Sequence, residues 1–321
     1  MATTMISTNP SLAIVFPGQG SQSVAMLSEL GAAYPVVLET FQEASTVLDF
    51  DLWDLVQNGP EAALGQTEKT QPALLAAGVA IWRVWQACGG DMPGWLAGHS
   101  LGEYTALVAS ESLHFADAIA LVAERGRLMQ EAVPSGQGAM AALLGLDDSA
   151  VRELCVQVRN DQVVEAVNLN APGQVVIAGH VAAVERAIAL ATERGAKRAV
   201  KLPVSVPSHC PLMRPAAARL EQHLQKLSLA SPVIPVLHNV DADCRNESTA
   251  LQEALVQQLY SPVRWVDTVR RLAAEGVQLV LEFGPGKVLS GLVRRIDRSI
   301  DVLPVFDPAS LDKALARLEG E

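Results

Sequence analysis

Residues 98–102, with the sequence GHSLG, constrain the fold of this chain more than any other segment. A short apolar run at 94–98 leads into this pentapeptide, and a helical pattern at 103–109 follows it. Its glycines allow a tight turn that a larger side chain would obstruct. A serine on such a turn, between a strand and a helix, stands clear of the backbone, as in a nucleophile elbow. The context favours this interpretation over an ordinary loop and predicts an α/β fold with Ser100 as candidate nucleophile.

Most of the chain has the pattern expected of such a fold. Residues 12–16 form an apolar run that stops at Pro17, which predicts a buried strand. The longest apolar stretch, around 73–82, predicts a buried helix. Other helices are expected at 22–30, 34–48, 72–88, 115–131, 212–227, 251–260 and 266–275, and further strands at 233–239 and 277–283.

The middle of the chain follows a different pattern. Its expected elements occur in the order β-α-β-β-α-β, which is typical of a ferredoxin-like unit. The strands are expected at 139–146, 164–170, 174–178 and 198–202, and the helices at 149–158 and 181–194. We therefore expect a large α/β domain of residues 1–134 and 205–321, with an inserted ferredoxin-like α+β subdomain of residues 135–204.

Composition excludes several classes of function. Four cysteines without a CxxC pair argue against a disulfide framework or a zinc site and for a reducing compartment. A formal net charge of −11 disfavours nucleic-acid binding. Residues 1–9 contain no Lys or Arg, and the stretch at 73–82 is too short to span a membrane. We expect a cytoplasmic protein that binds neither nucleic acid nor membrane.

A serine nucleophile needs a base, and histidine is the usual one. His209 lies in an irregular segment between Pro207 and Pro211, so it is the first candidate, and His238 is close behind. The neighbouring Cys210 could be a thiol nucleophile, but a buried, inert cysteine is favoured. The other histidines adjoin Ser100 on a diverging turn, lie in a connector or sit on or beside helices: His99, His114, His180 and His223.

Two further positions could bind charge. Gln19, in the segment 17–22 (PGQGSQ), can offer amide protons to an oxyanion, as can the main-chain amide of Leu101. The same glycine-rich turn could instead bind phosphate or no ligand. Arg125 could hold a carboxylate through two parallel hydrogen bonds. The alternative for Arg125 is a surface ion pair with neighbouring acidic residues.

Together these segments resemble the malonyl-CoA:acyl carrier protein transacylases of bacterial type II fatty acid synthesis. The resemblance covers nearly the whole chain, and several ordered matches are far more specific than GHSLG alone. One minor departure is Ser261, where asparagine is frequent. The matching segments are 16–22 (FPGQGSQ), 98–104 (GHSLGEY), 125–126 (RG), 129–132 (MQEA), 138–141 (GAMA), 168–179 (NLNAPGQVVIAG), 206–209 (VPSH), 259–265 (LYSPVRW) and 282–287 (EFGPGK).

The resemblance implies a hydrolase-like parallel-sheet domain with the ferredoxin-like insertion. It implies ping-pong transfer of malonyl from malonyl-CoA to the phosphopantetheine thiol of acyl carrier protein, with no metal and no cofactor beyond coenzyme A. We also expect a monomer. In the implied site, Ser100 is the nucleophile, His209 is its base, and Gln19 and Leu101 are the oxyanion donors. Arg125 binds the substrate carboxylate. Gln258 lies near the histidine, where a main-chain carbonyl orients the ring, and Gln71 and Asn168 line the cleft.

Three alternatives remain open from sequence. A serine esterase or thioesterase would share GHSLG, but the Gln19 segment, Arg125 and the lack of an acid paired with His209 argue against it. A stand-alone acyltransferase of a polyketide pathway, or of a malonate decarboxylase system, would keep the same chemistry. A non-catalytic binding module is disfavoured because Ser100, His209 and Arg125 are all present.

Overall fold

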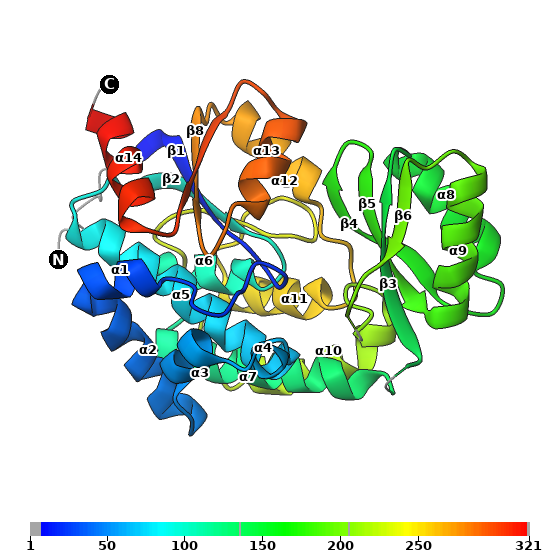
Figure 1. Cartoon of the computed structure of the whole chain (residues 1–321), viewed down its shortest axis with the longest axis horizontal. Coiled ribbons are helices and arrows are strands. Elements are labelled where there is room, and N and C mark those ends of the chain that lie inside the picture. Colours follow the sequence, from blue (N-terminus) through cyan, green and yellow to red (C-terminus); the bar gives the residue numbers. More distant parts are fainter. Residues whose placement is uncertain (1–7, 135, 205, 320–321) are drawn as a thin grey trace.

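The computed structural model describes residues 8–134, 136–204 and 206–319, and its strands form two separate sheets (Figure 1). The larger sheet has five parallel strands in the order β7-β2-β1-β8-β9. Strand β1, predicted at 12–16, lies at its centre. The five strands are β1 (Asn9–Phe16), β2 (Pro93–Gly98), β7 (Val236–Leu237), β8 (Leu279–Phe283) and β9 (Asp301–Val305).

Both faces of the larger sheet are covered, which explains why its strands read as continuous apolar runs. Leu12, Ile14 and Phe16 of β1 pack into the core on one face, and Ala13 and Val15 pack into the core on the other. The first core includes α2 (Pro35–Leu48), α5 (Thr67–Ala87), α6 (Gly102–Ala109), α7 (Phe115–Ala132), α10 (Arg214–Leu224) and α11 (Ser248–Gln258), and the second includes α12 (Trp265–Ala274) and α13 (Val288–Ile296).

The smaller sheet is antiparallel, with the order β4-β5-β3-β6. Helices α8 and α9 pack on one face of it, at one end of the molecule (Figure 1). The predicted fold class, a hydrolase-like parallel-sheet domain with a ferredoxin-like insertion, is confirmed. Positions 135 and 205, at the predicted borders of the insertion, lie outside the described residues. The elements are β3 (Gly138–Leu144), α8 (Asp148–Val158), β4 (Val164–Ala171), β5 (Gln174–His180), α9 (Val181–Glu193) and β6 (Arg198–Lys201).

The two sheets meet beside the GHSLG turn. Strand β4 forms main-chain hydrogen bonds with the segment before α12: Leu169 N donates to Val263 O at 3.0 Å, and Val263 N donates to Val167 O at 2.8 Å. The second face of the smaller sheet, which includes Met140 and Val176, therefore looks toward the larger domain. These contacts place strand β4 at the wall of a cleft.

Several predicted boundaries are wrong. The helix expected at 22–30 is only α1 (Ser28–Ala33), because left-handed backbone at Ala25 and Leu27 interrupts the helical path before it. Helix α5 begins at Thr67 rather than 72, so Pro72 lies inside the helix instead of at its start. The strand expected at 233–239 shrinks to β7. Five elements are not predicted: α3 (Leu52–Asn58), α4 (Glu61–Leu64), α13, β9 and α14 (Pro308–Glu319).

In the part of the chain that the structure describes, no helix combines the length and apolar character needed to cross a lipid bilayer.

Candidate active site

Ser100 sits on a sharp turn between β2 and α6, with a left-handed φ of 53°. The two flanking glycines are needed because there is no room for a side chain. A Cβ on Gly98 would lie 1.9 Å from the carbonyl carbon of Gly102, and a Cβ on Gly102 would lie 1.9 Å from the carbonyl oxygen of Phe16. The predicted elbow therefore exists, and close backbone packing is what requires its glycines.

Asn239, which directly follows the β7 region, clamps this turn. Its Oδ1 accepts a hydrogen bond from the Ser100 amide at 2.6 Å, and its Nδ2 donates to Gly98 O at 2.6 Å. One buried side chain thus holds both sides of the elbow and stabilises its strained backbone. Asn239 is not predicted as a site residue from the sequence, where it is the last residue of the strand expected at 233–239.

His209 lies against the serine. Its Nε2 is 2.8 Å from Ser100 Oγ, and its Nδ1 is 2.7 Å from the main-chain oxygen of Gln258. Because a carbonyl oxygen can only accept, Nδ1 must carry the proton, which leaves the Nε2 lone pair facing the hydroxyl. His238 contacts Glu103 instead, at 2.7 Å, and shows no contact with Ser100 among the described residues. The structure thus brings together the first candidate base and the candidate nucleophile.

Burial lowers the pKa of His209 to about 3; the nearby positive charge of Arg125 acts in the same direction, and the hydrogen bond to the Gln258 carbonyl opposes them. The ring is therefore neutral at pH 7 and able to accept the serine proton. Because the unfolded chain binds a proton on His209 near the ordinary pKa of about 6.5 and the folded protein does not, lowering the pH from about 6.5 toward 3 lowers the free energy of unfolding. Above about pH 6.5 the ring is neutral in both states, and this loss of stability is absent.

The low pKa of His209 leads to a prediction for the pH dependence of acylation. We expect kcat/KM for acylation of Ser100 to stay flat between about pH 8 and about pH 5, because the base remains neutral throughout this range. Mass spectrometry of reactions quenched at successive times would measure this rate at each pH, with circular dichroism to verify folding. A fall in rate centred near pH 6.5, with the fold intact, would show that His209 titrates like an exposed histidine.

Arg125, on α7, is a buried cation beside Ser100. Its side chain is 1% exposed. Nη1 donates to Gln71 Oε1 at 2.8 Å, Nη2 donates to Gln258 Oε1 at 2.9 Å, and Nη2 lies 3.4 Å from Ser100 Oγ. Burial lowers its pKa, but a guanidinium stays protonated in proteins. The surface ion pairs considered as the alternative are made by Arg127 instead.

The polar partners of Arg125 do not neutralise it. Its hydrogen-bond partners are two uncharged amides and the Ser100 hydroxyl, and no carboxylate pairs directly with its guanidinium in the described part of the chain. Its Nε is also buried without a partner among these residues. The buried carboxylate of Glu103 reaches Arg125 only through the Gln258 amide, so the guanidinium can still bind an anionic group delivered next to Ser100.

Ser100, His209 and Arg125 open into a cavity of about 320 Å³ between the two sheets. Gln19 is exposed at this cavity, with Nε2 3.5 Å from Thr67 Oγ1, so its amide is only weakly held. Leu101 is buried at the start of α6. The cavity walls also include the expected Gln71 and Asn168, together with Met129, Met140, Leu202 and Val206.

Two side chains considered from sequence have other surroundings. Cys210 is fully buried, and burial raises the pKa of its thiol to about 12, so it is not a thiolate nucleophile at neutral pH. His99 is half-buried and lines the same cavity, and its Nε2 lies 2.9 Å from Asn170 Oδ1 of strand β4. The His99–Asn170 contact ties the elbow to the insertion.

Comparison with known proteins agrees with this geometry. The acyl transferase domain family matches residues 13–306. The chain is 55% identical over 305 residues to the malonyl CoA-acyl carrier protein transacylase of Salmonella typhimurium, covering 95% of this chain and 99% of that protein. The structure of malonyl-CoA:acyl carrier protein transacylase from Xanthomonas oryzae matches with a TM-score of 0.96 at 55% identity, covering 97% and 99% of the two chains. A malonyl transacylase in complex with a type II polyketide synthase acyl carrier protein matches with a TM-score of 0.95 at 53% identity, covering 96% and 99%.

Proposed function

Because the chain belongs to the acyl transferase family, and within it to the malonyl CoA-acyl carrier protein transacylases, we propose that it transfers malonyl from coenzyme A to acyl carrier protein. The observation that carries this proposal is the buried Arg125 next to Ser100, which no carboxylate contacts directly among the described residues. A simple esterase has no need of a buried cation beside its nucleophile, whereas malonyl carries a carboxylate at the end remote from its thioester.

In the first half-reaction, Ser100 attacks the thioester carbonyl of malonyl-CoA. His209 Nε2, 2.8 Å from Oγ, takes the hydroxyl proton as the bond to carbon forms. The carbonyl oxygen becomes an oxyanion, for which we propose Gln19 and the Leu101 amide as donors. The C–S bond then breaks, and the leaving thiolate takes the proton from His209, which leaves a malonyl ester on Ser100.

In the second half-reaction, the phosphopantetheine thiol of the carrier protein attacks the malonyl ester. His209 takes the thiol proton and returns it to Ser100 Oγ as the ester bond breaks. Coenzyme A and the carrier thiol use the same nucleophile in turn, so the kinetics are ping-pong. No metal or organic cofactor is required, because the thioester already carries the activated acyl group.

Arg125 accounts for the choice of malonyl. Its guanidinium would hold the malonyl carboxylate by charge-assisted hydrogen bonds, while Gln71 and Gln258 hold the guanidinium from the other side. Fixing the remote end of the substrate orients the thioester toward Ser100. It also holds the malonyl ester in one orientation, in which attack by water is slower than attack by the thiol of the carrier protein.

We propose fatty acid biosynthesis as the pathway, with the protein acting as a cytoplasmic monomer. A polyketide pathway is the second candidate, because a 53% identical relative has been seen in complex with a type II polyketide synthase carrier protein. The two candidates share every chemical step and differ only in the acceptor. Comparing holo-carrier proteins of the two pathways as acceptors would separate them.

Transfer itself can be tested with carrier protein in its holo and apo forms. We expect malonyl from malonyl-CoA to appear on the holo form alone, since only that form has the phosphopantetheine thiol, and double-reciprocal plots to be parallel. Mass spectrometry of the carrier protein and a coenzyme A release assay would measure this. Release of free malonate at the same rate with and without holo-carrier protein would instead identify a hydrolase.

A further inference from the structure

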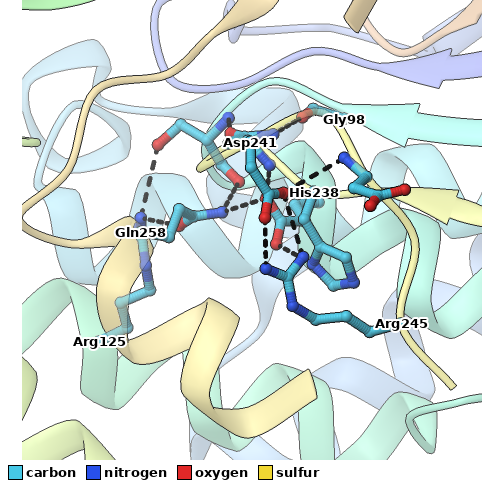
Figure 2. Close-up of polar contacts among 10 residues, drawn as sticks. Gly98, Arg125, His238, Asp241, Arg245 and Gln258 are labelled. Carbon is cyan, nitrogen blue, oxygen red and sulfur yellow. Dashed lines mark hydrogen bonds and ion pairs between the residues drawn. The ribbon is translucent and has the colours of Figure 1, made fainter. Parts of the chain in front are cut away.

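A buried carboxylate, Glu103, lies beneath the active site and has no role in the steps above. It belongs to the first turn of α6 and is 0% exposed. Its Oε1 contacts His238 Nδ1 at 2.7 Å, and its Oε2 accepts from Asn239 N at 2.8 Å and from Gln258 Nε2 at 2.9 Å. Figure 2 shows Gln258 lying between Arg125 and the group of residues around His238. Glu103 thus touches two residues that themselves hold the catalytic side chains.

The contact with Gln258 determines which way its side-chain amide points. Nε2 of Gln258 faces Glu103 Oε2 and the main-chain oxygen of Ser100, at 2.9 and 3.0 Å. Both groups can only accept, so the nitrogen must face them and Oε1 must face Arg125. A flipped amide would point its NH₂ at the guanidinium and its oxygen at two acceptors. Glu103 therefore favours the one amide orientation that binds Arg125.

The same arrangement keeps two buried opposite charges near one another without direct contact. One amide separates them: Arg125 Nη2 donates to Gln258 Oε1, and Gln258 Nε2 donates to Glu103 Oε2. A direct ion pair with Glu103 would occupy the guanidinium and compete with a substrate carboxylate. The intervening amide instead holds Arg125 in place and leaves N–H groups for the ligand.

We propose that Glu103 is a positioning residue for malonyl recognition, acting through the Gln258 amide on Arg125. This inference rests on the proposed function, because it assigns Arg125 to the malonyl carboxylate. The second contact of Glu103, with Asn239, supports the Ser100 elbow. Its loss should therefore lower the reactivity of Ser100 toward every acylating reagent alike. Malonyl recognition and general serine reactivity can therefore be measured separately.

Two substitutions separate position from charge. Glu103→Asp keeps the charge but withdraws the carboxylate by about 1.5 Å, one carbon–carbon bond, out of reach of Gln258. Glu103→Gln keeps the length: its oxygen can replace Oε2, and its NH₂ can donate to His238 Nδ1 when that ring carries its proton on Nε2. Glu282→Asp is the matched control, since Glu282 is also 0% exposed but is hydrogen-bonded to Leu289 and Ser290 at the start of α13.

The readout is the kcat/KM for malonyl loading divided by the rate of inactivation by phenylmethylsulfonyl fluoride, which reacts with the serine but carries no carboxylate. We expect Glu103→Asp to lower this ratio about tenfold or more, the size of one lost charge-assisted hydrogen bond. Glu103→Gln, which keeps a hydrogen bond to Gln258, is expected to lower it less than about threefold. Glu282→Asp is expected to lower the melting temperature and leave the ratio unchanged.

A ratio that falls more in Glu103→Gln than in Glu103→Asp would overturn the proposal, because the charge of Glu103 rather than the position of its carboxylate would then determine malonyl recognition. An unchanged ratio in both would overturn it as well. If Glu103→Asp does not fold, Gln258→Met replaces it: the amide is lost, the main-chain carbonyl at 258 stays, and the ratio must fall in the same way. A wild-type protein that malonyl-CoA does not load would refute the proposed function itself.

Discussion

Replacing Arg125 with alanine is expected to lower kcat/KM for malonyl loading of Ser100 by about 10²–10³-fold, which corresponds to about 3–4 kcal/mol of transition-state stabilisation. The guanidinium is 1% exposed and hydrogen-bonded to two uncharged amides and the Ser100 hydroxyl, so this cation is placed to meet a carboxylate beside the serine. Without it, the malonyl carboxylate would be buried without a partner. Acetyl loading, which involves no carboxylate, is expected to change much less, so the preference for malonyl should be lost.

The Arg125→Ala experiment has a matched control two residues away. Arg127 lies on the same helix, but its side chain is exposed and paired with Glu124 and Glu131. Arg127→Ala should therefore leave both loading rates within about twofold, as is usual for an exposed ion pair. Time courses of intact mass with malonyl-CoA and with acetyl-CoA give the two loading rates of the wild type and of each variant. An Arg125→Ala protein that still prefers malonyl would remove the arginine from substrate recognition.

The second large effect is expected at the base. His209→Ala should lower the rate of Ser100 acylation by about 10²–10⁴-fold, because no other group among the described residues is placed to take the hydroxyl proton. The substrate carboxylate would still meet Arg125, so binding should weaken far less than turnover. Single-turnover kinetics at several malonyl-CoA concentrations separate the two effects.

His223→Ala is the control for His209→Ala. His223 is a partly exposed histidine of α10 that lies 3.3 Å from Glu124, and its loss should leave acylation unchanged. If His209→Ala retained acylation near the wild-type rate while remaining folded, His209 would not be the base. His238 would then become the group to test, since sequence alone leaves these two histidines nearly equal.

Much of the fold can be predicted from the chain because burial on both faces makes its strands apolar throughout. Strand β1 and the order of elements in the insertion follow from this pattern. The errors lie where tertiary contacts override local pattern. Ala25 and Leu27 adopt left-handed backbone, which no propensity favours for these residues. Strand β7 keeps only two residues, although the apolar run containing it is longer.

The site is only partly predictable for a related reason. Ser100, His209, Arg125 and Gln258 match motifs of the family, and the fold brings them together from four separate segments. The residues that hold them are less visible. Glu103 lies in the first turn of a helix, where an acidic residue is ordinarily an exposed partner of the helix dipole. Its burial comes from contacts with residues more than 130 positions away.

The central claim is that Ser100 carries malonyl between coenzyme A and the carrier protein. The most direct test is the intact mass of the protein after mixing with malonyl-CoA, beside a Ser100→Ala variant. We predict one malonyl adduct on the wild type alone, discharged by holo-carrier protein much faster than by water. No adduct on the folded wild type, or an equal adduct on Ser100→Ala, would contradict the account.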